Sequence, residues 1–420
     1  MLFRDATLAD GRVRDVRIDG ESIVDVGTGL DDDGETIDAD GKRLLPGMID
    51  AHVHFRQPGF PHKETWLTGS KSAAAGGVTT VFDQPNTEPP TVDAAGYERK
   101  AELASASLVD YAINGGVTDD WAPEELLEKP IGALGEVFLA DSTGEMGIGT
   151  GRYEEAVKRA HDAGVPITVH AEDAALFDES VIDRTDPDAW SAYRTAAAEI
   201  EAIRHACRVA ADLGARVHIA HTSTPEGVEA TSEAGMTCEV TPHHLFLSRA
   251  DLEELGTFGR MNPPLRSEDR RESMLRLLAD GDIDIVATDH APHTRTEKDA
   301  GIWDAPSGVP GVETALPLLL EEARNGRLGY DRIRDVTAAN VADIFGLEHG
   351  GRIEAGNRAD LVLVDPDASV PIRGEDLHSK CEWTPFEGRR GVFPELTTVR
   401  GCVVFRDGEF ADVAGRNVRR

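Results

Sequence analysis

The sequence contains few cysteines and few aromatic residues, and it has no long apolar run. Its four cysteines stand apart and form no Cys-x-x-Cys pair, which excludes a disulfide framework and a thiolate zinc site. No stretch approaches the ~18–20 apolar residues of a membrane span, and the first ten residues lack the apolar core of a secretory signal. These absences predict a cytoplasmic protein with reduced thiols and no membrane segment.

Basic residues are also scarce. Acidic side chains outnumber basic ones by 77 to 43, the net charge is −34, and only eight of the basic residues are lysines. This balance argues against nucleic acids and anionic membranes as partners, since both require a basic face. The acidic residues are dispersed, and at about 1 M salt the Debye length is roughly 3 Å, so they would barely repel one another. The composition favours a halophilic protein, with an ordinary acidic enzyme as the alternative.

The two ends of the chain have the pattern of short strands and turns. Residues 13–26 alternate apolar and polar around an Asp-Gly turn, and residues 398–405 lead to a second Asp-Gly pair. A hydrophobic fraction of 40% is enough for more than one packed region in 420 residues. We expect residues 1–46 and 355–420 to form one small β-sandwich domain together.

The middle of the chain, residues 47–354, alternates β-like runs with amphipathic helical segments. Apolar residues recur at i, i+3 and i+4 in residues 153–163, 192–213 and 269–278. The β-like runs cover residues 48–54, 79–86, 109–115, 135–141, 166–170, 217–221, 237–241 and 283–290. Eight such units predict an α/β fold, a (β/α)8 TIM-like barrel, whose functional groups lie at the C-terminal ends of the strands.

Ionisable side chains end several of these runs. His52 and His54 form a His-x-His pair, and strand periodicity points both imidazoles to the same face, at the mouth of the barrel. His170, His221 and Asp289 end three later runs. Four histidines with two or three carboxylates suit two divalent cations that share a bridging carboxylate and a bridging water. Such a pair generates hydroxide near neutral pH, which predicts hydrolysis of a carbonyl–nitrogen bond or its reverse.

Other polar residues have less specific interpretations. His218 lies on the strand face opposite His221, where packing or hydrogen bonding under a helix is expected. His243 and His244 follow the seventh run and could face the mouth or make structural hydrogen bonds. We expect Lys63 and Glu64 to orient the loop after the first run, with no catalytic role.

Eight motifs stand in order along the chain. They are residues 46–59 (Pro-Gly-Met-Ile-Asp-Ala-His-Val-His-Phe-Arg-Gln-Pro-Gly), 84–87, 239–245, 262–266, 287–293, 308–314, 356–363 and 384–388. In this order they resemble the amidohydrolase superfamily and, within it, the class I dihydroorotases, over nearly the whole chain. The resemblance implies the interconversion of N-carbamoyl-L-aspartate and (S)-dihydroorotate in de novo pyrimidine (UMP) synthesis.

The resemblance also implies a metal site. His52, His54 and Asp289 would hold one zinc ion, and His170 and His221 would hold the other. Asp289 would also take the proton of the attacking hydroxide and deliver it to the leaving amide nitrogen. The native metal stays open, because histidine and carboxylate also accept cobalt or manganese.

The metal-bridging residue departs from the family pattern. Many relatives bridge their metals with a carboxylated lysine on the fourth strand, but residues 135–141 contain no lysine. Glu136 stands at the corresponding position and can present a carboxylate at similar reach. We therefore predict Glu136 as the bridging ligand, with Asp141 as the alternative.

Substrate-binding residues are implied in the same way. Arg56, Asn86 and His293 would bind the substrate carboxylate, and the fork of a guanidinium suits a carboxylate in bidentate fashion. Asn262 and the backbone of Pro310 and Gly311 would contact the ring.

Two other cyclic amidohydrolase activities and a non-catalytic role are the alternatives to dihydroorotase activity. Allantoinase and dihydropyrimidinase share the metal motifs but act on uncharged rings, so the cation at Arg56 argues against them. A non-catalytic scaffold homologue would lack metal ligands that this sequence retains. The sequence leaves open whether the chain forms a homodimer or associates with aspartate transcarbamoylase.

Overall fold

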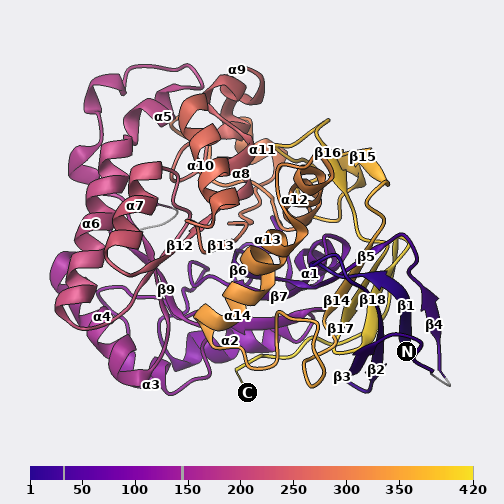
Figure 1. The fold of residues 1–420 in the computed structure, drawn as a ribbon. Coiled ribbons are helices and arrows are strands. Elements are labelled where there is room, and N and C mark those ends of the chain that lie inside the picture. The colour runs from indigo at the N-terminus through magenta and orange to yellow at the C-terminus, as the bar shows by residue number, and fades with distance from the viewer. Residues whose placement is uncertain (32–33, 143–145, 420) are drawn as a thin grey trace.

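The structure is a computed structural model of the chain and describes residues 1–31, 34–142 and 146–419. Its middle is a barrel of eight parallel strands (Figure 1). The strands are β6 (Met48–Val53), β7 (Val78–Asp83), β8 (Asp110–Ile113), β9 (Leu134–Phe138), β10 (Ile167–His170), β11 (His218–Ile219), β12 (Thr237–Val240) and β13 (Ile285–Val286). Each overlaps one predicted run, so the barrel prediction is confirmed.

The barrel is closed by two isolated bridges. The strands form two parallel sheets, β6-β7-β8 and β13-β12-β11-β10-β9. Gly115 pairs with Leu134 between β8 and β9, and Val53 pairs with His290 just beyond β13. The strand ends after β6 and β13 therefore lie side by side, which brings the first and last motifs of the barrel together.

Helices surround the strands. They are α1 (Trp66–Ala75), α2 (Ala94–Ala104), α3 (Pro123–Leu127), α4 (Thr150–Ala163), α5 (Ala189–Tyr193), α6 (Ala196–Asp212), α7 (Pro225–Glu233), α8 (Pro242–Phe246), α9 (Leu252–Leu255), α10 (Glu268–Asp280), α11 (Arg295–Lys298), α12 (Ala315–Arg324), α13 (Tyr330–Arg334) and α14 (Asn340–Phe345). Predicted segments 153–163 and 269–278 fall within α4 and α10. Segment 192–213 is divided, because the Thr195 side chain accepts a hydrogen bond from the Ala198 N–H and begins α6 as its N-cap.

The interior below the strand ends is apolar. Ile49, Ala51, Phe82 and Ile285 form a buried cluster with α14, whose Phe345 is fully buried. This end of the barrel is a packed core, as expected of a (β/α)8 fold. Polar chemistry is left to the opposite end, where the strands finish.

The two ends of the chain share one sheet of nine strands. Its members are β1 (Leu2–Thr7), β2 (Val13–Asp19), β3 (Ser22–Gly27), β4 (Thr36–Asp38), β5 (Arg43–Pro46), β14 (Leu361–Val364), β17 (Leu396–Val399), β18 (Cys402–Arg406) and β19 (Glu409–Phe410). β14 lies between β5 and β17 and pairs antiparallel with both, which joins the N-terminal and C-terminal strands. Side chains from both ends form one core cluster of their own.

A turn divides the predicted C-terminal segment 398–405. It lies at Arg400 and Gly401, with φ of 49° and 70°, and separates β17 from β18. A Cβ at Gly401 would lie 2.3 Å from the Gly20 carbonyl oxygen, so glycine is required there. The domain boundaries 1–46, 47–354 and 355–420 stay a prediction, and residues 415–418 hydrogen-bond to the barrel at 107–111.

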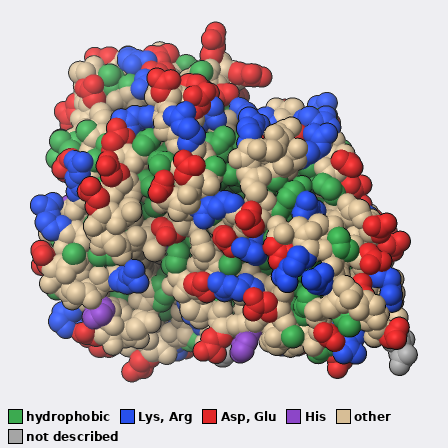
Figure 2. All heavy atoms as spheres, in the orientation of Figure 1, with side chains coloured by type: hydrophobic (Ala, Val, Ile, Leu, Met, Phe, Trp, Pro, Cys, Tyr) green, Lys and Arg blue, Asp and Glu red, His purple; other side chains and the backbone are tan. Residues whose placement is uncertain are grey.

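The last part of the chain also reaches the barrel. β15 (Ser369–Pro371) and β16 (Arg390–Val392) pair antiparallel as a small separate sheet, and β16 packs on α12. Acidic side chains are spread over the face in Figure 2, among arginines and lysines, and do not gather in one patch. Among the described helices, none is long and apolar enough to cross a membrane.

Candidate active site at the barrel mouth

Three histidines from three strand ends lie around the carboxylate of Glu136, which stands on a fourth strand. Oε1 of Glu136, on β9, lies 2.8 Å from Nδ1 of His170 and 2.6 Å from Nε2 of His221. Oε2 of Glu136 lies 3.3 Å from Nε2 of His52. Glu136 thus contacts histidines from both halves of the predicted site, as a bridging ligand must.

A second carboxylate completes the cluster. Oδ1 of Asp289 lies 2.9 Å from Nε2 of His54 and 3.6 Å from Nε2 of His52. Asp289, His54 and His52 are all buried, with exposed fractions of 7%, 6% and 1%. The structure therefore brings together all six residues that the sequence predicted as ligands.

The geometry fits two metal ions. Two overlapping groups have ligand atoms within 4.8 Å of one another, one made by His52, His54 and Glu136 and one by Glu136, His170 and His221. In the described part of the chain, Nε2 of His52 and Nδ1 of His221 are buried and have no hydrogen-bond partner. Buried polar nitrogens are rarely left unpaired, and imidazole with carboxylate is a donor set that divalent cations accept.

The two central carboxylates are ionised. Burial alone would raise the pKa of Glu136, but the neighbouring His52 and His221 hold it well below its usual range. The pKa of Asp289 is likewise lowered against the effect of burial, by its hydrogen bond with His54 and by His52. The centre of the cluster is anionic, which favours cations there.

The far nitrogens of three histidines are held by partners outside the cluster. Nδ1 of His52 lies 2.6 Å from Oε1 of Glu239, and Nε2 of His170 lies 2.9 Å from Oε2 of Glu172. Nδ1 of His54 lies 2.8 Å from Oδ1 of Asn86, which orients this ring in addition to lining the site. Such partners fix which ring nitrogen faces a metal.

Glu172 and Glu239 were missed by the sequence reasoning. Glu172 follows His170 by two residues, and Arg194 forks onto it with contacts of 2.6 to 3.1 Å. Glu239 also meets the His218 ring at 3.2 Å, so His218 has the structural role that was expected. The position of Glu172 two residues after His170 was a usable signal, but the contact of Glu239 with His52 joins β12 to β6 and has no local signal.

Three site residues have backbone conformations that are rare without glycine. The φ angles of Arg56, His221 and Asp289 are 63°, 33° and 46°. Such angles cost of order 1–3 kcal/mol each and concentrate at functional sites. Here they turn the chain sharply at the strand ends and direct these side chains across the mouth.

A basic group lies beside the cluster. Arg56 is 3% exposed, its Nε donates to the Pro292 carbonyl at 3.2 Å, and its Nη2 lies 3.1 Å from Nε2 of His293. Burial lowers the pKa of Arg56 to about 10, which leaves it charged at neutral pH. Asn262 also lines this cavity, and its Nδ2 donates to Oγ of Ser142 at 3.0 Å.

The predicted contact of the Pro310 and Gly311 backbone with the ring stays a prediction. These residues line a separate small cavity, where the Gly311 N–H donates to Nδ1 of His290 at 3.1 Å. The loop instead presents Ser307 and Gly308 to the site. The reason is the bridge between Val309 and His290, which ties the loop to the last strand and leads the chain away beyond it.

The alternative bridging residue lies outside the cluster. Asp141 is exposed, and its Oδ1 accepts a hydrogen bond from the Gly147 N–H at 2.7 Å. His244 bonds to Thr241 and to the Pro263 carbonyl, which is a structural role, and burial lowers the pKa of the neighbouring His243 to about 3. Glu136 is therefore the carboxylate whose position suits a bridge.

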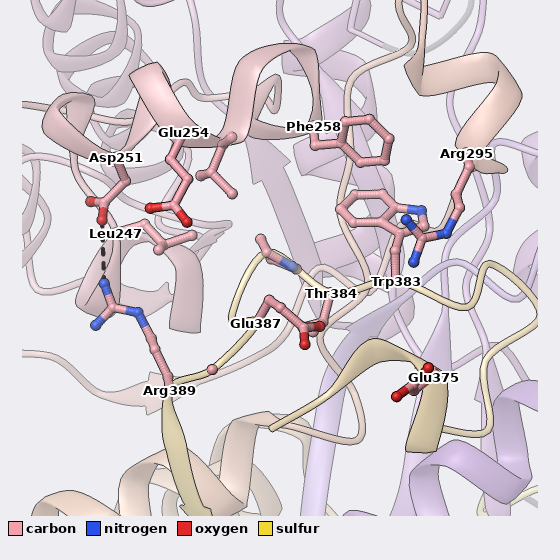
Figure 3. Close-up of a pocket in the computed structure, with 13 residues that line it drawn as sticks. Leu247, Asp251, Glu254, Phe258, Arg295, Glu375, Trp383, Thr384, Glu387 and Arg389 are labelled. Carbon is pink, nitrogen blue, oxygen red and sulfur yellow. Dashed lines mark hydrogen bonds and ion pairs between the residues drawn. The ribbon is translucent and has the colours of Figure 1, made fainter. Parts of the chain in front are cut away.

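The site is recognised by its chemistry and not by its size. Its cavity measures about 20 Å³, whereas a groove of about 780 Å³ lies between α9 and the segment that carries Trp383 (Figure 3). The groove contains none of the clustered histidines, and a dashed line in Figure 3 marks the contact of Asp251 with Arg389. Trp383 connects the two regions, because its Nε1 donates to the His293 carbonyl at 2.8 Å.

Comparison with known proteins agrees with this geometry. The model of the Amidohydrolase family matches residues 43–392, and the chain belongs to this family. Within it, the dihydroorotase of Halobacterium salinarum is 64% identical over 422 residues and covers 100% of both chains. The dihydroorotase of Methanosarcina acetivorans is 44% identical over 90% of this chain and 87% of its own. The chain thus groups with the dihydroorotases and is a hydrolase of cyclic amides.

Related enzymes share the fold. The L-hydantoinase (dihydropyrimidinase) from Arthrobacter aurescens has a TM-score of 0.93 and 28% identity, and covers 99% of this chain and 98% of its own. An allantoinase of Salmonella choleraesuis is 32% identical over 94% of this chain and 92% of its own. The fold is therefore confirmed, and the ranking by identity favours dihydroorotase over allantoinase.

Proposed function

We propose that the chain interconverts N-carbamoyl-L-aspartate and (S)-dihydroorotate in pyrimidine synthesis. One observation carries this proposal: the buried, charged Arg56 lies beside the anionic cluster of Glu136 and Asp289. A cyclic amide that bears a carboxylate can place its anionic group on the guanidinium and its ring amide at the cluster. Allantoin and dihydrouracil are uncharged and would leave this buried cation without a partner.

The histidines and carboxylates would hold two divalent cations, which we propose to be zinc. His52, His54 and Asp289 would bind one, His170 and His221 the other, with Glu136 shared between them. Bound cations would act as Lewis acids on the ring carbonyl and make hydroxide available near neutral pH. Metal analysis of Glu136→Ala and Asp141→Ala tests the assignment, since full occupancy in the Glu136 variant would contradict it.

The chain's own residues would perform binding and proton transfer. Arg56, with His293 and Asn86 nearby, would hold the substrate carboxylate. Asn262 and the backbone of Pro310 and Gly311 would contact the ring, with Ser307 and Gly308 of the same loop lining the cavity. In hydrolysis, an oxygen of Asp289 would accept the proton released as water attacks the ring carbonyl. The same oxygen would then donate that proton to the departing amide nitrogen. In cyclisation the proton moves in the opposite direction.

The direct test is turnover by metal-replete protein. Dihydroorotate and allantoin are offered separately, and ring opening is followed by ultraviolet absorbance. We expect dihydroorotate to be hydrolysed and allantoin to be left unchanged. Hydrolysis of allantoin without turnover of dihydroorotate would overturn the proposal, and metal-replete protein that acts on neither would favour a scaffold role.

The setting of the enzyme belongs to the same proposal. The dispersed acidic surface favours work in a salt-rich cytoplasm, which an assay of turnover across KCl concentrations tests. Homodimer formation and association with aspartate transcarbamoylase remain hypotheses. Sedimentation of the chain alone and mixed with that enzyme measures both.

A further inference from the structure

Lys63 is a neighbour of the site that the proposed reaction does not use. It lies in the loop after β6, and its Nζ is 3.1 Å from Nδ1 of His293 and 3.1 Å from Oε1 of Glu297. Its side chain is 13% exposed, and His293 is fully buried. Burial and the charge of Arg56 lower the pKa of Lys63, and its ion pair with Glu297 opposes them. As an ammonium group, Lys63 can only donate hydrogen bonds.

These contacts fix the tautomer of His293. Because Lys63 donates to Nδ1, that nitrogen must carry a lone pair. Nε2 lies 2.9 Å from the carbonyl oxygen of Ser307, which can only accept, so Nε2 must carry the proton. Burial, together with the charges of Arg56 and Lys63, holds the pKa of His293 well below its usual range, so the ring is neutral. Two independent neighbours thus select the same form.

The tautomer determines what Arg56 can bind. Nη2 of Arg56 lies 3.1 Å from Nε2 of His293. With a proton on Nε2, both atoms are donors, and the guanidinium cannot be satisfied by the ring. With the opposite tautomer, Nε2 would accept from Arg56 and compete with any ligand for it. The Nε2 proton of His293 goes to the Ser307 carbonyl, so the observed form leaves Nη2 of Arg56 unpaired with the ring and available to an acceptor such as a carboxylate.

We propose that Lys63 is a positioning residue that sets the preference of this site for a carboxylate, by holding His293 as the Nε2–H tautomer beside Arg56. The proposal rests on the proposed function and names the device that favours an anionic ring over an uncharged one. Lys63 touches neither the reacting atoms nor the clustered ligands, so its effect falls on binding.

Nuclear magnetic resonance tests the tautomer directly. Protein labelled with ¹⁵N in histidine gives separate signals for protonated and unprotonated ring nitrogens, and loss of one set in His293→Gln assigns them. We expect a neutral ring with the proton on Nε2 in the wild-type protein. A proton on Nδ1, or on both nitrogens at pH 7.5, would overturn the proposal without any Lys63 variant.

Kinetics then separates binding from chemistry. In Lys63→Met we expect the KM for dihydroorotate to rise by about tenfold or more, the effect of losing a hydrogen bond to a charged group, with kcat within about twofold. Lys63→Arg keeps a donor-only cation and should restore both KM and tautomer. Lys158→Met, which removes an exposed lysine paired with Asp162, is the matched control and should behave as wild type.

Two kinetic results would refute the positioning role of Lys63. An unchanged KM in folded Lys63→Met, or a fall in kcat alone, would refute the positioning role. If Lys63→Met does not fold, Lys63→Gln replaces it, because an amide can also accept and should release the tautomer. If the wild-type protein turns over no dihydroorotate, the proposed function fails, while the tautomer measurement still decides whether Lys63 controls His293.

Discussion

A buried ion pair behind the first strand end should support both stability and activity. Nζ of Lys100, on α2, lies 2.7 Å from Oδ2 of Asp83 at the end of β7, and both side chains are fully buried. Lys100 also donates to the Gln84 carbonyl at 2.5 Å. The other oxygen of Asp83 accepts the Phe55 N–H at 2.6 Å. Phe55 stands between His54 and Arg56, so this pair anchors the backbone of the site.

Replacing Lys100 by methionine leaves the Asp83 carboxylate buried without its counter-ion. Removing one partner of a buried pair typically costs about 3–5 kcal/mol, because the remaining charge has lost its compensation. The double variant Lys100→Met with Asp83→Asn removes both charges and keeps an acceptor for the Phe55 N–H. We expect it to recover most of the loss, with a coupling energy of at least about 2 kcal/mol.

Urea unfolding at fixed molar KCl, followed by circular dichroism, measures the four members of this cycle. Dihydroorotate kinetics on the folded variants should show a higher KM for Lys100→Met, since the shifted Phe55 carries Arg56 with it. Additive effects of the two substitutions, or a loss below about 1 kcal/mol for Lys100→Met, would refute the reasoning.

Three further predictions concern other parts of the chain. The Glu313 hydrogen bond raises the pKa of His378, so His378 stabilises the fold below its ordinary pKa and loses this effect as pH rises through the folded value. His378→Gln should lower the free energy of unfolding in urea by less than about 1 kcal/mol at pH 5.5 and leave it unchanged at pH 9. Lys298→Met should cost about 1–3 kcal/mol in urea unfolding for each buried carbonyl left unpaired and lower kcat/KM, because buried Nζ of Lys298 donates to three carbonyls, including that of Gly308 in the site. Binding of N-carbamoyl-L-aspartate, measured by calorimetry, should hold or tighten between about 0.5 and 3 M KCl, because salt screens the repulsive far field; steep weakening of the folded protein's binding would contradict this.

The strand ends of the barrel could be read from the sequence because their signal is local. An apolar run that finishes in histidine or aspartate gives both the strand and the direction of its last side chain, as at His170 and Asp289. Glu136 could be chosen over Asp141 only through the resemblance, because it stands where many relatives carry the carboxylated lysine. Glu172, two residues after His170, had a local signal that was not used, whereas the contact of Glu239 with His52 crosses the barrel and has none.

Loops and turns that are placed by distant backbone could not be predicted from the sequence. Val309 pairs with His290, and Ser307 and Gly308 line the cavity, while the ring contact of Pro310 and Gly311 stays a prediction. A turn at Arg400 and Gly401 divides residues 398–405 between β17 and β18, and the Gly20 carbonyl leaves no room there for a Cβ on Gly401. Pattern and propensity describe neither of these approaches, because both depend on partners far away in the sequence.

The net charge of −34 gains a different meaning once the site is seen. An anionic substrate is repelled by the overall field, so the acidic surface cannot serve recognition, and we propose solvation at high salt as its use. Recognition must come from positive charge that acts at short range within the acidic protein. The mouth of the barrel contains such charge, because Arg56, with Lys63 behind His293, faces an anionic cluster built on Glu136 and Asp289. The two halves suit opposite charges, cations at the carboxylates and the substrate carboxylate at the guanidinium. Salt screens charges that are several ångströms apart in water, whereas the contacts of the site are about 3 Å long and buried. Rising salt therefore removes the long-range repulsion of the substrate and leaves its binding at the site in place.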